Sequence, residues 1–151
     1  MKTTADFPKL TLPPCRLKVA ERGGELRVWD VVRGRWLILT PEEWVRRHVL
    51  AMLTGGYGVA AASIAQEYPV AVNGQAQRAD IVVFGAGAKP LMLIECKAPD
   101  VAVSRATLDQ AFRYNAVLGA RYVMLTNGLA HFIYEVTPTG EYLPLKNFPK
   151  L

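Results

Sequence analysis

Two apolar runs separated by a short glycine-rich segment form the strongest pattern in the chain. The first reads RADIVVF at residues 78–84, the second reads LMLIECK at residues 91–97, and GAGAKP joins them. Residues two apart along a strand share a face, so both faces of the second run are apolar until Glu95 and Lys97. This pattern is typical of a central, covered strand. It predicts an antiparallel hairpin whose free end carries charges.

Short β patterns precede this hairpin. Residues 1–14 contain three prolines and no periodicity, so an extended arm is expected there. Residues 17–39 form short β runs separated by glycine-containing turns, which predicts a small antiparallel meander. We interpret residues 1–39 as an arm and meander packed on the main domain. Trp29 and Trp36 are interpreted as packed cross-strand residues, with base stacking as the alternative.

A helix is predicted over residues 40–54. Thr40 is a favourable N-cap, and Glu43, three residues later, completes a capping box. Glu42 lies three residues before Val45, the spacing that places both on the inward stripe of a helix. Glu42 is therefore expected to face the interior of the domain, and Glu43 remains the rival for that position.

The remaining pattern predicts a mixed sheet with helices on both faces. Further strands are expected at 64–72, 75–84, 91–97, 121–126 and 129–136, and a second helix at 104–118. A strand, helix, strand succession implies a crossover and parallel pairing, whereas the hairpins imply antiparallel pairing. The expected fold class is α/β with three α/β/α layers. Residues 40–137 form this core, and the proline-rich residues 138–151 are expected to be an irregular tail.

Composition narrows the functional classes only slightly. The 151 residues suffice for one domain with a sizeable core, and the net charge of +5 mildly favours an anionic partner such as nucleic acid. Candidate phosphate contacts, with a solvated basic face as the alternative, are Arg46, Arg47, Arg105, Arg113 and Arg121. Two distant cysteines form no disulfide framework or zinc spacing. No signal peptide or membrane-length apolar run is present, so a cytoplasmic protein without a membrane partner is expected.

The hairpin places two carboxylates together. Asp80 begins one strand and Glu95 ends the next, and antiparallel pairing brings these ends side by side. Adjacent carboxylates raise each other's proton affinity unless a cation lies between them. Oxygen ligands without histidine or cysteine select Mg²⁺ or Mn²⁺, and the backbone carbonyl of Cys96 is a further candidate ligand. Lys97 would then lie beside the metal, placed to orient a water or stabilise developing phosphoryl charge.

These residues carry a family resemblance. Asp80 followed by Glu95-Cys96-Lys97 resembles the PD-(D/E)xK nuclease motif, with Ala79 where that motif has proline. The strings LTPEEWVRRH, RADIVVF, IECKAP, DQAFRYN and TNG are similar to the N-terminal nuclease domain of type I restriction enzyme R subunits, and particularly to a small stand-alone group related to it. The resemblance covers residues 35–136 and implies a restriction-endonuclease-like fold.

The resemblance also implies a function: a Mg²⁺-dependent or Mn²⁺-dependent DNA endonuclease of the restriction type. By carry-over, Asp80 and Glu95 hold the metal, Glu42 supports it directly or through water, and Lys97 assists the attacking water. Gln110 resembles the helix glutamine that positions the lysine or the DNA in such enzymes, and its other interpretation is a solvated helix residue.

Alternatives remain open. The chain could be a catalytically silent nuclease-fold module that binds nucleic acid or assembles with partner proteins. Asp80 could simply pair with Arg78, Glu95 could form an exposed pair with Lys97, and Glu42 could merely favour the helix dipole. The chain has no GxxxxGK[ST] motif, so it has no translocase of its own. The expected partners are DNA and restriction-modification subunits, and a homodimer is also open.

Overall fold

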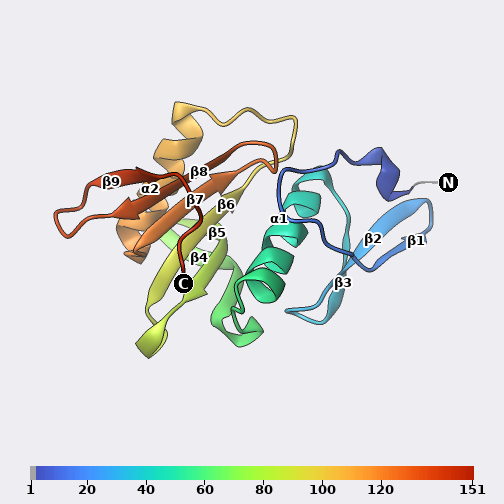
Figure 1. The fold of residues 1–151 in the computed structure, drawn as a ribbon, viewed down its shortest axis with the longest axis horizontal. Coiled ribbons are helices and arrows are strands. Elements are labelled where there is room, and N and C mark those ends of the chain that lie inside the picture. Colours follow the sequence, from blue (N-terminus) through green and yellow to red (C-terminus); the bar gives the residue numbers. More distant parts are fainter. Residues whose placement is uncertain (1–2) are drawn as a thin grey trace.

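The computed structural model describes residues 3–151, which build two β-sheets and two main helices (Figure 1). The first sheet is antiparallel and contains β1 (Val19–Arg22), β2 (Glu25–Asp30) and β3 (Arg35–Ile38). The second sheet follows chain order and contains β4 (Ile64–Val72), β5 (Gln75–Phe84), β6 (Pro90–Cys96), β7 (Tyr122–Thr126), β8 (His131–Val136) and β9 (Tyr142–Leu145). The predicted meander is confirmed, including the cross-strand pairing of Trp29 with Trp36.

The six-stranded sheet is mixed, as predicted. β6 and β7 pair in parallel, and every other neighbouring pair is antiparallel. Helix α1 (Pro41–Ala51) contributes to the hydrophobic cluster on one face, and helix α2 (Arg105–Leu118) contributes to the cluster on the other. The α/β/α layering expected from the sequence is therefore present. Among residues 3–151, no helix is long and apolar enough to cross a membrane.

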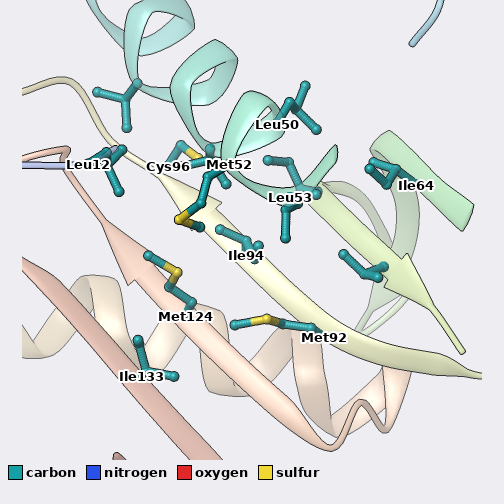
Figure 2. Packing of buried hydrophobic residues seen from close by; sticks show 14 of the residues in the cluster. Leu12, Leu50, Met52, Leu53, Ile64, Met92, Ile94, Cys96, Met124 and Ile133 are labelled. Atoms are coloured by element: carbon teal, nitrogen blue, oxygen red, sulfur yellow. The ribbon is translucent and has the colours of Figure 1, made fainter. Parts of the chain in front are cut away.

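Helix α1 lies between the two sheets (Figure 1). The hydroxyl of Thr40 caps it by accepting the Glu43 N–H at 3.1 Å. The predicted capping box is only half formed, because the Glu43 carboxylate turns instead to the arginines of the next turn. Val45 and Val49 are fully buried, and the helix runs into a π-helical turn at Met52–Gly56. Figure 2 shows side chains from this end of the helix packed against the central strand β6.

Helix α2 begins and ends as the sequence predicts. The hydroxyl of Ser104 accepts the Thr107 N–H, and the Thr107 hydroxyl accepts the Ser104 N–H in return. Gly119 ends the helix in the left-handed region at φ +71°. Ala111 and Tyr114 are buried against the face of the sheet opposite α1.

Partway along β4 and β5, side chains of the same parity switch from one face of the sheet to the other. Ile64 packs in the cluster under α1, whereas Tyr68, four residues on, packs in the cluster under α2. On β5 the same change separates Ala79, on the α2 side, from Ile81, on the α1 side. Strict alternation would keep both pairs on one face. This switch of faces coincides with Glu67, whose φ of +52° is unusual for a residue with a β-carbon.

The N-terminal arm is pinned to the main domain rather than merely extended. It contains a short 3₁₀ turn at Thr4–Asp6, after which Leu10 and Leu12 are buried in the cluster under α1. The backbone of Thr11 donates to the carbonyl of Gly128 at 2.8 Å. The arm therefore supplies part of the core.

The tail differs from the expectation of an irregular segment. Tyr142–Leu145 forms β9, the edge strand of the large sheet, with Pro144 opposite Tyr134 of β8. A proline within the strand argues against a central position, but an edge strand tolerates it because one side needs no ladder hydrogen bond. The ring of Tyr142 stacks on Phe112 of α2, with centroids 4.0 Å apart.

The contact between the arm and Gly128 yields a stability prediction. Gly128 has φ +85°, and a β-carbon there would lie 2.7 Å from Cδ2 of Leu10. We expect Gly128→Ala to lower the free energy of unfolding by about 2–4 kcal/mol, combining backbone strain with overpacking. Urea denaturation measures the loss.

Gly140 supplies the matched control, because it has the same φ of +85° and no atom lies within 4 Å of the place that a β-carbon would occupy. Gly140→Ala should therefore cost only the strain of roughly 1–2 kcal/mol. In a Leu10→Ala background, the cost of Gly128→Ala should fall most of the way to that of Gly140→Ala, with a remainder from Cγ2 of Val45, which would lie 3.2 Å from the β-carbon. Equal losses in the wild-type background would contradict the proposed clash.

Candidate functional site

Asp80 and Glu95 lie directly opposite each other on β5 and β6. The register that pairs Ile81 with Ile94 places them one step further along the hairpin. The backbone N–H of Asp80 donates to Glu95 Oε1 at 3.2 Å, and the N–H of Cys96 donates to Asp80 Oδ2 at 2.8 Å. The structure thus brings together the two carboxylates that the sequence placed at adjacent strand ends.

Glu95 is in an environment that disfavours a negative charge. It is 5% exposed, and burial together with the charge of Asp80 raises its pKa to about 9. The charge of Lys97 acts in the opposite direction. A divalent cation between the two carboxylates would relieve this penalty, and carboxylate oxygens are ligands that Mg²⁺ accepts. The donor chemistry of this pair fits such an ion.

Arg46 on α1 connects this pair to further acidic residues. Its Nη2 lies 3.3 Å from Asp80 Oδ1 and 3.1 Å from Glu42 Oε1. Its Nη1 lies 2.9 Å from Glu43 Oε1 and 3.5 Å from Glu67 Oε1. Arg46 is only 5% exposed, so one buried guanidinium contacts four carboxylates from three elements. The sequence-based alternatives for Arg46, a phosphate contact or a solvated basic face, do not describe this position.

Arg47 extends the cluster toward the meander and is likewise buried, at 4% exposure. Its Nη1 lies 3.0 Å from Oδ1 of Asp30, the fully buried last residue of β2. Arg33 pairs with the same carboxylate and reaches Glu67 Oε2 at 3.2 Å. Gln66 also donates to Asp30 through its side-chain amide. A continuous chain of ion pairs therefore joins the meander, α1 and β4 to Asp80.

Glu42 and Glu43 occupy different parts of this network. Burial raises the pKa of Glu42, the charge of Asp80 adds to the effect, and the charges of Arg46 and Lys97 oppose it. Glu42 thus lies within electrostatic reach of the Asp80 pair, which it joins through Arg46. Glu43 pairs with Arg46 as well but also turns to Arg47, away from Asp80. The Glu42 side chain is 44% exposed and that of Glu43 is 14% exposed, so the expectation that Glu42 faces the interior of the domain is not met. Glu42 is joined to Asp80 through Arg46, and its choice over Glu43 as the α1 member of the site stays a prediction.

Lys97 follows the last residue of β6. Its backbone N–H donates to the carbonyl of Thr126 at 2.8 Å, which fixes its main chain to the end of β7. The charge of its ammonium opposes the rise in the pKa of both Glu42 and Glu95, so it lies within electrostatic reach of both carboxylates. Within residues 3–151 this ammonium forms no ion pair, so the interpretation as a direct Glu95–Lys97 pair does not describe it.

Helix α2 carries one expected site residue, Gln110, and one missed residue, Tyr114. Gln110 lines a pocket of about 250 Å³ with Gln77, Arg113 and Tyr114, and Lys97 is not among the residues that line it. Tyr114, one turn further along α2, lies within electrostatic reach of the two carboxylates. Burial raises its pKa, and the charges of Glu95 and Asp80 add to the effect. The sequence signal was the spacing of Gln110 and Tyr114 by one helical turn.

Sequence reasoning also missed Glu67. It stands opposite Asp80 in the register, between the pairs Gln66–Ile81 and Tyr68–Ala79. Its left-handed backbone and its contacts with two arginines place it in the acidic cluster. No sequence rule places a glutamate at positive φ, so this position carried no detectable signal.

The described residues do not assemble a complete set of protein ligands for a metal. No three histidine, cysteine, aspartate or glutamate side chains among residues 3–151 form a group that could hold an ion. Asp80 and Glu95 supply two carboxylates, whereas Glu42 is turned to Arg46. Cys96 can contribute only its backbone, because its thiol is buried in the core and burial raises its pKa well above the usual value. Further ligands must be the backbone or water.

Comparisons with known proteins point to one family and a similar fold. Residues 41–149 match the sequence profile of the family described as type I restriction enzyme R protein N terminus (HSDR_N). The fold is similar to a fragment assigned to an HsdR subunit of a type I restriction enzyme from Vibrio vulnificus YJ016, with a TM-score of 0.52 and 26% sequence identity. That similarity covers 74% of this chain and 24% of the fragment, so this chain spans about a quarter of its length. No curated protein matches the sequence.

The ion pairs of Asp30 generate a pH-dependent prediction. Burial opposes ionisation of Asp30, but hydrogen bonding to Arg33 and the charge of Arg47 outweigh it and lower the pKa. A lowered folded-state pKa contributes stability that is present above the unfolded pKa of about 3.9 and is lost as pH falls through the folded value. Asp30→Asn should therefore cost roughly 3–5 kcal/mol at pH 7. Denaturant titrations between pH 7 and pH 3 measure the free energy of unfolding of wild type and Asp30→Asn. The difference between the two proteins should become smaller only below about pH 4.

An exposed ion pair provides the comparison. Glu135 lies 2.8 Å from Arg121, and the side chains are 32% and 63% exposed. Glu135→Gln should cost only about 0–1 kcal/mol, because solvent screens such pairs. A pH-independent deficit for Asp30→Asn, or a deficit as small as that of Glu135→Gln, would show that the buried network does not stabilise the fold.

Proposed function

The chain belongs to the family of type I restriction enzyme R protein N-terminal domains, and from this we propose that it is a metal-dependent DNA endonuclease of the restriction type. One observation carries the proposal: Asp80 and Glu95 face each other across the ends of β5 and β6, immediately before Lys97. Two carboxylates followed by a lysine whose ammonium forms no ion pair within residues 3–151 are a suitable arrangement for phosphodiester hydrolysis.

Each residue has a chemical task in this proposal. Asp80 and Glu95 would hold Mg²⁺ or Mn²⁺, with the backbone carbonyl of Cys96 as a further ligand. The ion would supply Lewis-acid activation of a water and of the phosphoryl oxygens. Lys97 would orient that water or stabilise charge that develops on the phosphate. Glu42 would act through water, because it reaches Asp80 only by way of Arg46.

The α2 face would meet the DNA or support Lys97. Gln110 lines a polar pocket beside Tyr114, and Tyr114 lies within reach of the charges of Glu95 and Asp80. A pocket lined by polar side chains is suited to hydrogen bonds with a nucleic-acid backbone. We propose DNA as the substrate and other restriction-modification subunits as partners, since the family's R proteins are named for such enzymes.

A second candidate is a nuclease-fold module that binds nucleic acid without cleaving it. The observation in its favour is that Arg46 already neutralises Asp80, whose two oxygens both have donors within the protein. A centre satisfied in this way does not need a metal for structural integrity. Metal binding and cleavage separate the two candidates.

The first test of the proposal is metal binding. Calorimetric titration with Mn²⁺ should detect one site in the wild-type chain, and Asp80→Ala should abolish it because half of the carboxylate pair is lost. Asp109→Ala is the control: Asp109 is a half-exposed aspartate on α2 whose ion-pair partner within residues 3–151 is Arg105. Unchanged Mn²⁺ affinity in Asp80→Ala would rule out this site, whereas a loss in both variants would indicate a nonspecific effect.

The second test concerns Lys97. Lys97→Ala should retain Mn²⁺ and DNA binding but lose cleavage by roughly 10²-fold or more, because one well-placed charge at the reacting phosphate is worth that much. Cleavage of supercoiled, linear and branched DNA in Mg²⁺ and in Mn²⁺ measures the effect. Lys89→Ala, at the exposed opposite end of β6, is the control. Equal cleavage by wild type and Lys97→Ala would remove Lys97 from the mechanism, and inactivity of the wild type on every substrate would favour the binding module.

A further inference from the structure

Arg46 holds the oxygen of Asp80 that an incoming cation would need. Its Nη2 lies 3.3 Å from Asp80 Oδ1, while Asp80 Oδ2 accepts the N–H of Cys96 at 2.8 Å. Both oxygens of Asp80 therefore have donors that belong to the protein. On the opposite strand, Glu95 Oε1 accepts the N–H of Asp80. A cation bound to Asp80 has to share or take over the contact that Arg46 makes.

We propose that Arg46 is a built-in substitute for the metal ion, which neutralises Asp80 before the cation binds and releases Asp80 Oδ1 when it arrives. The inference rests on the proposed function, because it requires the cation site at Asp80 and Glu95. Two positive charges beside one carboxylate repel each other, so the guanidinium and the cation compete. The affinity for the metal is then set partly by Arg46 and not by the carboxylates alone.

The surroundings of Arg46 make its release from Asp80 inexpensive. Its Nη1 remains 2.9 Å from Glu43 and 3.5 Å from Glu67, and its Nη2 remains 3.1 Å from Glu42. A buried guanidinium that loses its last carboxylate is strongly destabilising, but Arg46 keeps three after leaving Asp80. A small rotation of the guanidinium within the cluster therefore suffices.

The opposite role would be purely structural support, in which Arg46 holds Asp80 and Glu42 in the geometry that the metal requires. The two roles predict changes of opposite sign. Removal of a competing charge strengthens metal binding, whereas removal of a support weakens it.

The deciding experiment compares Arg46→Gln with Arg47→Gln in calorimetric titrations with Mn²⁺ at fixed pH and ionic strength. Glutamine removes the charge and retains a hydrogen-bonding amide. Arg47 is the matched control, because it is equally buried in the same network and contacts Asp30 and Glu43 but not Asp80. Arg46→Gln should bind Mn²⁺ roughly tenfold or more tightly than wild type, the usual effect of one nearby charge. Arg47→Gln should match wild type.

The outcomes separate the inference from the proposed function. If wild type binds Mn²⁺ and Arg46→Gln binds it equally or more weakly, the inference is wrong and the metal site stands. If Arg46→Gln binds Mn²⁺ measurably and wild type does not, the inference about Arg46 and the proposed metal site are both supported. If neither wild type nor Arg46→Gln binds Mn²⁺, the inference about Arg46 and the proposed metal site are both wrong.

A measurement on the wild-type chain covers the case in which Arg46→Gln does not fold. In the ¹⁵N-labelled protein, the guanidinium signals of Arg46, assigned with Arg46→Lys, should shift on titration with Mg²⁺ and saturate together with metal binding. The signals of Arg47 should stay nearly constant. Mg²⁺ binding that leaves the Arg46 signals unchanged would overturn the inference.

Discussion

The buried cluster of arginines and carboxylates between α1 and the strands is the interaction on which the rest of the structure depends. Arg46 and Arg47 are almost fully inaccessible, and their partners come from the meander, from α1 itself, and from β4 and β5. Removal of one member from such a cluster leaves an uncompensated buried charge and typically costs about 3–5 kcal/mol. The meander and the candidate site are therefore energetically linked through adjacent residues of one helix.

The backbone at Glu67 shows how that cluster shapes the sheet. A glutamate at φ +52° carries a cost of order 1–2 kcal/mol, and the surrounding contacts have to compensate for it. Arg33 and Arg46 each bind one oxygen of its carboxylate. The same residue marks the point at which β4 and β5 change faces. Because of this turnover, the strands pack under both helices while Asp80 still reaches a donor on α1.

Local rules account for the part of the site that was predictable. Antiparallel pairing requires the start of one strand to meet the end of the next, so the positions of Asp80 and Glu95 followed from the hairpin pattern alone. The caps at Thr40 and Ser104 fixed the starts of both helices for equally local reasons. The resemblance to restriction enzyme R subunits, carried by strings along the chain, identified the family correctly.

The rest depended on contacts between distant residues, which a sequence pattern does not contain. Charged residues are almost never buried unless they are paired, so Arg46 and Arg47 favoured a surface interpretation until their partners were located. Glu67 belongs to the cluster only because of a backbone conformation that glutamate rarely adopts. Pro144 argued against a strand, although the edge position of β9 removes the objection.

The charge balance of the cluster explains how an acidic centre can fold before any cation is bound. Four carboxylates around one position would repel one another strongly in a poorly hydrated environment. Arg46 supplies a fixed positive charge to all four of its neighbours, and burial together with the charge of Asp80 raises the pKa of Glu95, which favours its neutral form. Part of the acidic charge is thus balanced by residues of the fold itself, unlike in domains whose charged ligands are balanced only by a metal ion. Under the proposed function, a cation at Asp80 would compete with a charge that the fold already contains, and Arg46 would then set the metal affinity together with the carboxylates that it contacts.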